Sequence, residues 1–283
     1  MSWVLALILV FSFTAFGQNS NNVLLVDEPG KAVLRIFVNC EYKLVLKSPK
    51  DKEIKININQ IGNGFFTGSH SGSFDFVASA AHLFLCNTSM GELVSRGILA
   101  DIDRNSEEDL SIDNIVALKE GRVGSILAFT FDGASVSKIS IVFITPAPKI
   151  LSDPDRALLT VTVPEDVIHN HIDLMDDKIF DGVFYKSGIG KEVIARGFLL
   201  YNGGWFLRYR NALIEWLRAD IFQVNEILDN GLSGSPVVYF YEGKMYAIGV
   251  VSHGPIQQSA RTFDMSWITI LKKSFLDSKE KKK

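Results

Sequence analysis

The chain has 283 residues and a formal net charge of −3, and 47% of its residues are hydrophobic. This length suits one large or two small domains with well-buried cores. A charge so close to neutral gives no sign of the basic surface that nucleic-acid binding requires, so we expect no nucleic-acid partner. The lysine-rich end, residues 277–283, is predicted to be a solvated basic tail.

Residues 1–17 contain an apolar run from Trp3 to Val10, followed by small residues at Ala15 and Gly17. This pattern predicts a signal peptide and therefore a secreted protein, although no basic residue precedes the apolar run. The alternative is an uncleaved segment that tethers the chain to a membrane, although an apolar stretch of about 14 residues is short for a span. We expect contact with a membrane only in that alternative.

The chain has two cysteines, Cys40 and Cys86. They either form one disulfide or remain separate buried thiols, and the sequence leaves both possibilities open.

Residues 23–59 consist of short β-prone runs without a helical repeat, and Lys52–Ile58 alternates polar with apolar side chains as a half-buried strand does. Residues 146–157, which contain three prolines, are predicted to link two halves. Within residues 158–276 we predict further strands at the spacing typical of a barrel. These are Leu158–Val163, Lys178–Phe184, Glu192–Leu200, Trp205–Tyr209 and a hairpin of Val237–Tyr241 with Lys244–Val251.

Two stretches of the second half differ from this pattern. Residues 212–219 fit a helix or a strand and stay unassigned. Met265–Leu276 places its apolar residues at helical spacing, which predicts a C-terminal amphipathic helix.

A glycine-rich turn, Gly231-Leu232-Ser233-Gly234-Ser235-Pro236, carries the strongest chemical signal. Glycines let the backbone adopt a tight turn that directs N–H groups at one point, where the oxyanion of an acyl transfer would be stabilised. We predict Ser233 as a nucleophile, with the N–H groups of Gly231 and Ser233 as the oxyanion donors. A serine nucleophile needs a base and a group that orients the base.

The candidate base is His82, which follows the small residues Ser79-Ala80-Ala81 at the end of a predicted strand. Taken together, the Ser233 turn, the run Ile248–Gly254 and the Ser79–His82 box resemble the corresponding segments of chymotrypsin-like serine proteases. The resemblance extends over about residues 23–276, and the chain looks closer to the bacterial and viral branches than to disulfide-rich digestive trypsins.

The resemblance implies an all-β fold of two antiparallel six-stranded β-barrels with a closing C-terminal helix. Residues 23–145 would form the first barrel with the base, and residues 158–276 the second with the nucleophile. It also implies a serine endopeptidase that forms an acyl-enzyme on Ser233, acts on protein or peptide substrates and uses no cofactor. The pair His169 and His171 has no third ligand at a sensible spacing, so we predict no metal site.

The resemblance also requires an acid between the base and the nucleophile, at the start of a strand. Asp109, which precedes Leu110-Ser111-Ile112, fits this pattern best, and Asp101, Asp103 and Asp113 are rivals. The carboxylate of Asp109 would fix the tautomer of the His82 imidazole.

The implied substrate pocket is lined by residues before and after the nucleophile. These are Ile227, Leu228, Ser252, His253 and Gly254. Because Ile227 stands at the base of the pocket, we expect an apolar or small residue before the cut bond. The alternative is selection of Glu or Gln through His253.

Leu232 stands where activated digestive proteases have an aspartate that binds a newly cut amino terminus, so that mode of activation is not expected here. Two other functions compete with the protease. A catalytically silent binding protein of the same fold usually lacks the serine or the histidine, and a lipase or esterase would need a helix after the nucleophile turn, where a strand is predicted.

Overall fold

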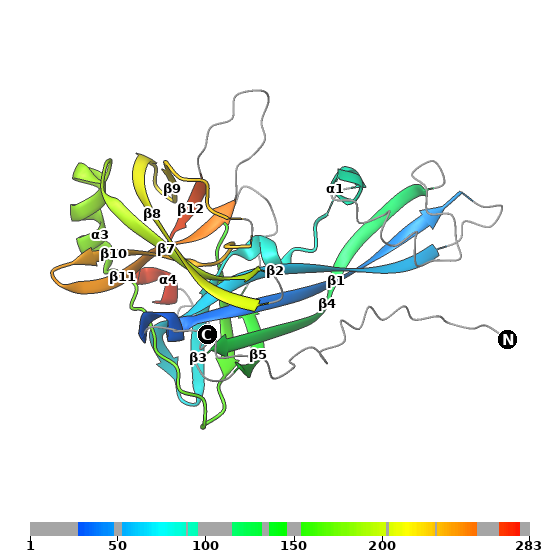
Figure 1. The fold of residues 1–283 in the computed structure, drawn as a ribbon, viewed down its shortest axis with the longest axis horizontal. Coiled ribbons are helices and arrows are strands. Elements are labelled where there is room, and N and C mark those ends of the chain that lie inside the picture. The colour runs from blue at the N-terminus through cyan, green and yellow to red at the C-terminus, as the bar shows by residue number, and fades with distance from the viewer. Residues whose placement is uncertain are drawn as a thin grey trace.

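The structure is a computed structural model that describes residues 28–47, 53–88, 90–95, 115–131, 136–145, 154–201, 204–229, 231–253 and 266–277. The described chain forms two closed antiparallel β-barrels of six strands each (Figure 1). The predicted all-β double-barrel class is therefore confirmed.

The first barrel has the strand order β1-β2-β3-β6-β5-β4. Its strands are β1 (Val33–Leu46), β2 (Glu53–Ser71), β3 (Phe74–Ser79), β4 (Ile115–Phe131), β5 (Val136–Thr145) and β6 (Ala157–Thr162). The second barrel has the order β10-β11-β12-β9-β8-β7. Its strands are β7 (Glu192–Tyr201), β8 (Gly204–Leu217), β9 (Ile221–Val224), β10 (Pro236–Tyr241), β11 (Lys244–His253) and β12 (Ser266–Ile270).

The helical elements are short. They are η2 (Glu28–Ala32), η3 (Ala81–Phe84), α1 (Met90–Ser95), α3 (Asp177–Phe180), the π-helical turn η5 (Asp181–Tyr185) and α4 (Ser274–Asp277). Among the described residues, no helix has the length and apolarity needed to cross a membrane. Residues 1–17 and the tail from 278 lie outside the described part of the chain.

Strand β1 shows why these residues form a barrel. From Ile36 to Leu46 every second side chain is buried, as expected when one face of a strand packs on a core and the other does not. The strand pairs with β2 from Val33↔Phe65 to Val45↔Glu53 and with β4 on its other side. These three strands extend away from the second barrel as a long arm (Figure 1).

The predicted boundary between the halves is wrong in one respect. The strand expected at Leu158–Val163 to open the second half is β6, which pairs with β3 and β5 and so completes the first barrel. The prolines of residues 146–157 wrongly indicated a linker between the halves, because this stretch stands between β5 and β6, which both belong to the first barrel. A strand that closes a barrel is defined by distant partners. The part of the predicted linker that the structure describes, residues 154–157, leads directly into β6.

Two predicted elements of the second half are also wrong. Lys178–Phe184, expected as a strand, is helical in α3 and η5, where Asp176 caps the helix by accepting from the Lys178 N–H. Met265–Leu276, expected as an amphipathic helix, contains strand β12, and only Ser274–Asp277 is helical. The β-branched run Ile268-Thr269-Ile270 favours a strand.

The hairpin of β10 and β11 agrees with the prediction. Its turn residues Glu242 and Gly243 have φ of 49° and 76°. Positive φ at both central positions is the conformation that a two-residue hairpin turn requires. The unassigned residues 212–219 continue strand β8 as far as Leu217.

The two barrels are joined by apolar packing and by a connecting segment that hydrogen-bonds to both. Phe65 and Ala78 of the first barrel share a buried cluster with Val238, Ala247 and Val250 of the second. A second cluster joins Phe131 to Phe198, whose rings lie 4.5 Å apart. Residues 172–175 hydrogen-bond to β2 through the Ile172 N–H and to β11 through the Met175 N–H. The barrels are therefore held in contact along their shared face.

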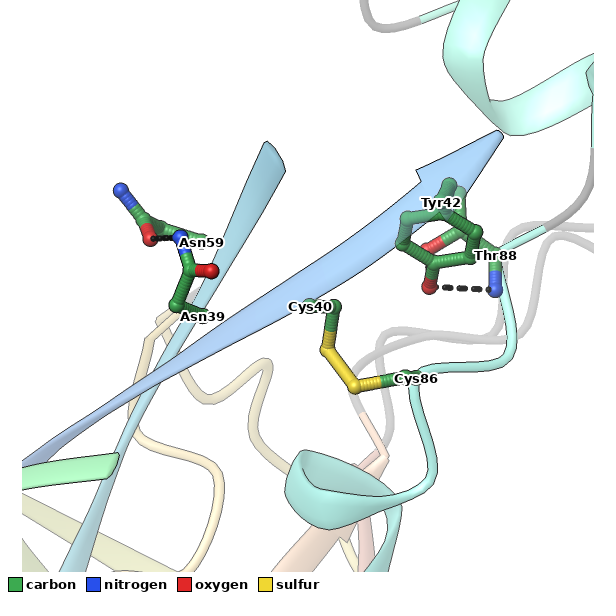
Figure 2. The surroundings of a disulfide bond; sticks show 6 residues. All are labelled: Asn39, Cys40, Tyr42, Asn59, Cys86 and Thr88. Carbon is green, nitrogen blue, oxygen red and sulfur yellow. Dashed lines mark hydrogen bonds between the residues drawn. A yellow bond between two sulfur atoms is a disulfide. The ribbon is translucent and has the colours of Figure 1, made fainter. Parts of the chain in front are cut away.

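Cys40 and Cys86 form a disulfide, which settles the alternative that the sequence left open. Figure 2 shows that the bond connects β1 to the segment that follows η3. Beside it, the hydroxyl of Tyr42 lies 3.1 Å from both the hydroxyl and the N–H of Thr88 (Figure 2). The segment after His82 is thus attached to β1 by a covalent bond and two hydrogen bonds.

We predict that replacing both cysteines by alanine lowers the free energy of unfolding by about 2–4 kcal/mol, because the bridge constrains a long loop of the unfolded chain. The bridged residues are 46 positions apart. Urea unfolding of the variant and of the native chain with and without a reducing agent measures this effect. The reducing agent should destabilise the native chain only, and equal stability of the oxidised native chain and the variant would contradict the prediction.

Candidate active site

The structure places an acid beside His82. Nδ1 of His82 lies 2.6 Å from Oδ2 of Asp155, and the His82 backbone N–H donates to Oδ1 of the same carboxylate at 2.7 Å. Both side chains are partly enclosed, with 26% of His82 and 12% of Asp155 exposed. The carboxylate therefore fixes both the position of the histidine and the orientation of its ring.

The second barrel also binds this carboxylate. The hydroxyl of Ser252, on β11, donates to Oδ2 of Asp155 at 2.5 Å. Burial alone raises the pKa of Asp155, but the hydrogen bonds from His82 and Ser252 and the electrostatic interaction with His82 outweigh this effect. The pKa of Asp155 is consequently held below its ordinary value, and the group is ionised at neutral pH.

Asp155 takes the place that the sequence analysis assigned to Asp109. Asp109 and its rivals Asp101, Asp103 and Asp113 lie outside the described residues. A signal for Asp155 does exist, because it precedes the apolar run Ala157-Leu158-Leu159 at the start of β6. The neighbouring Pro154 and the charged Arg156 made this stretch resemble a linker, so the signal was missed.

Ser233 lies in a turn that is fixed by its own hydrogen bonds. The N–H of Leu232 donates to the carbonyl of Asp229, and the N–H of Ser235 to that of Leu232. The N–H of Gly234 donates to the carbonyl of Val251, the neighbour of Ser252. The turn is therefore attached to the strand whose next residue holds Asp155.

Positive φ values occur on both sides of Ser233, at Gly231 (97°) and Gly234 (79°). A side chain at either position would be strained. Space is also lacking at Gly234, where a Cβ would lie 2.0 Å from the carbonyl oxygen of Asn63. These glycines are needed for the shape of the turn.

The first barrel contacts the same turn from the other side. The N–H of Asn63 donates to the carbonyl of Ser233 at 2.7 Å. A Cβ on Gly62 would meet this carbonyl as well as the side chain of Leu83, the residue after His82. The turn also packs near Ala80, whose N atom would lie 3.1 Å from a Cβ on Gly234. The Ser233 turn and the His82 segment therefore lie against each other at the junction of the barrels.

The N–H groups of Gly231 and Ser233, predicted as oxyanion donors, have no hydrogen-bond acceptor in the described parts of the chain. The other three N–H groups of the turn, from Leu232, Gly234 and Ser235, are all bonded. The hydrogen bonds of the turn thus use the N–H groups that catalysis would not need.

The predicted pocket residues have different surroundings. The side chain of Leu228 is buried, and its N–H donates to the hydroxyl of Ser266, whereas Ile227 is 44% exposed. Ser252 is buried and supports Asp155. His253 ends β11, where it pairs with Trp267, and Gly254 lies outside the described residues.

Sequence reasoning missed two more residues at this junction, Arg35 and Asn63. Arg35 is a charged residue in an apolar strand, and Asn63 sits between two glycines. Neither pattern identifies a site without the three-dimensional contacts.

The arrangement supplies the components of acyl transfer by a serine. A carboxylate orients an imidazole, a serine turn lies beside the segment that carries this imidazole, and two N–H groups are placed on that turn. Among the described residues no group of three or more His, Cys, Asp or Glu side chains is placed to hold a metal ion.

Replacing Asp155 by asparagine should lower the free energy of unfolding by about 1.5–3 kcal/mol near pH 6, because a charged acceptor of buried hydrogen bonds is lost. The native pKa lies below that of the unfolded chain, about 3.9, so this stability is present above pH 4 and is lost as the pH falls through the native pKa. The difference between variant and native chain should therefore shrink in acid.

Urea unfolding at a series of pH values between 2.5 and 6 measures this difference. The matched control is Asp173→Asn, which removes an exposed ion pair with Lys244 and should cost at most about 1 kcal/mol. A destabilisation by Asp155→Asn that stays constant across this range would contradict the assignment.

Comparisons with known proteins identify no relative of this chain: no protein-family model matches it, and neither does any curated protein.

Proposed function

We propose that this protein is a serine endopeptidase that cleaves peptide bonds through an acyl-enzyme on Ser233. The observation that carries the proposal is the network of His82, Asp155 and Ser252, which spans the two barrels beside the Ser233 turn. An ionised acid bonded to Nδ1 places the proton of a neutral imidazole on that atom and leaves Nε2 to accept a proton.

In this mechanism His82 removes the hydroxyl proton of Ser233 as the oxygen attacks the peptide carbonyl carbon. The negative charge that develops on the carbonyl oxygen is stabilised by the N–H groups of Gly231 and Ser233. The imidazolium then gives its proton to the departing amine as the C–N bond breaks. A water molecule, deprotonated by His82, hydrolyses the ester and restores the serine.

The proposed specificity is for an apolar or small residue before the cut bond. It rests on the exposed side chain of Ile227, which offers no carboxylate to a basic substrate residue. The alternative is a preference for Glu or Gln through His253, and cleavage of a peptide library distinguishes the two.

We also propose that the protein acts outside the cytosol. The Cys40–Cys86 disulfide supports this, because such bonds form and persist in oxidising compartments. The apolar segment at residues 1–17 suits the same route.

A fluorophosphonate probe should label the purified full-length chain at Ser233, and Ser233→Ala should abolish labelling. The matched control is Ser235→Ala, two residues along the same turn. The hydroxyl of Ser235 is buried and has no hydrogen-bond partner among the described residues, so its removal should not reduce stability. Asp155→Asn should slow labelling by up to roughly 10⁴-fold, because the imidazole loses the acceptor that fixes its tautomer.

Mass spectrometry of the labelled peptide locates the modified serine. Labelling at a different serine, or labelling that survives Ser233→Ala, would refute the assignment of the nucleophile. A folded native chain that neither reacts with the probe nor cleaves a peptide library would favour a binding protein of the same fold.

A further inference from the structure

Arg35 lies in β1 of the first barrel, only 3% exposed, and its bonds reach the second barrel. Its Nη1 atom donates to the carbonyl of Phe198 at 2.6 Å and to the carbonyl of Gly231 at 2.7 Å. Burial lowers the pKa of Arg35 from its ordinary value to about 10, so the guanidinium stays charged at neutral pH. A buried cation of one barrel thus binds two backbone carbonyls of the other.

Asn63 stands directly opposite Arg35 in the β1–β2 register and binds the same two residues. Its Nδ2 donates to the Gly231 carbonyl at 2.7 Å, and its Oδ1 accepts from the Phe198 N–H at 2.9 Å. Its own N–H binds the Ser233 carbonyl. Asn63 is itself held in place, because its carbonyl accepts from the hydroxyl of Ser79.

The Gly231 carbonyl therefore has two donors, one of them charged, and both come from the first barrel. Gly231 has no side chain to limit its torsions, and its φ of 97° lies where other residues are strained. The guanidinium lies on the side where a side chain of residue 231 would stand, since a Cβ on Gly231 would lie 3.4 Å from Nη2 of Arg35. The conformation of Gly231 is thus set by contacts from outside the turn.

We propose that Arg35 and Asn63 form an interbarrel clamp, which positions the N–H groups of Gly231 and Ser233 for the oxyanion of the reaction. The clamp holds the carbonyls of Gly231 and Ser233, and these two residues carry the proposed donors. This inference rests on the proposed function, in which Arg35 and Asn63 are positioning residues. Because Arg35 and Asn63 both belong to the first barrel, the oxyanion site is complete only while the barrels are docked.

The clamp explains how the turn keeps its shape with Leu232 at its centre. Leu232 is fully buried in the apolar core of the second barrel, so the turn is anchored on that side by packing. On the other side it is anchored by the charged and amide donors of the first barrel. No ion pair of residue 232 is needed to hold it.

The test compares Arg35→Met with Arg196→Met. Arg196 is a comparably buried arginine, 5% exposed, which stacks on Tyr209 and contacts Met245 within the second barrel. Arg35→Met should lower kcat and the rate of probe labelling at Ser233 by roughly 100-fold, the effect of losing an oxyanion donor, while KM changes less than about threefold. Arg35→Lys, which keeps the charge, should recover part of kcat.

Arg196→Met should lower the thermal stability about as much as Arg35→Met does, but it should keep kcat within about threefold of the native value. If the two methionine variants lose kcat to the same extent, Arg35 has only a structural role and the clamp is refuted. Labelling of Arg35→Met at the native rate would also refute it. If Arg35→Met does not fold, the same measurements on Asn63→Ala test the clamp, because this variant removes the second donor to the Gly231 carbonyl.

The native chain separates this inference from the proposed function. If native protein is not labelled at Ser233, the proposed function fails and the clamp fails with it. If native protein is labelled and kcat does not depend on Arg35 or Asn63, the protease remains and only the clamp is wrong.

Discussion

The carboxylate of Asp155 accepts hydrogen bonds from both barrels at once. His82 of the first barrel donates to it twice, and Ser252 of the second donates once. Because a buried charge is costly unless its hydrogen bonds are satisfied, these three hydrogen bonds allow Asp155 to stay ionised where the docked barrels enclose it. Asp155 therefore links three features of the structure. These are the position of His82, the attachment of the Ser233 turn through Val251 and Gly234, and the contact between the barrels.

Local signals predicted much of the architecture. The alternation at Lys52–Ile58, most of which lies in β2, and the glycine-bearing turn at Glu242 led to correct strands, because both depend on neighbours in sequence. The errors at Lys178–Phe184 and Met265–Leu276 arose in short apolar stretches, where the spacing suits either a strand or a helix. The membership of β6 could not be predicted, since its partners β3 and β5 are selected by closure of the barrel.

The candidate site was predictable where residue type and spacing carry the chemistry, and not elsewhere. His82 and Ser233 stand in distinctive turns. Asp155 precedes an apolar run as the acid should, but an aspartate near prolines is common in solvated positions, so this signal did not single it out. Arg35 becomes recognisable only when the fold brings it to its partners. Both contribute through bonds across more than 70 residues of sequence.

The position of β6 has a consequence for any attempt to divide this protein. A cut anywhere in residues 146–153 would separate Asp155 and β6 from the barrel that they complete. The amino-terminal fragment would expose the edges of β3 and β5, and the carboxyl-terminal fragment would carry a strand without a partner, both of which favour aggregation. A dissection that keeps each barrel whole has to fall after Thr162, and even then each fragment would retain only a portion of the candidate site.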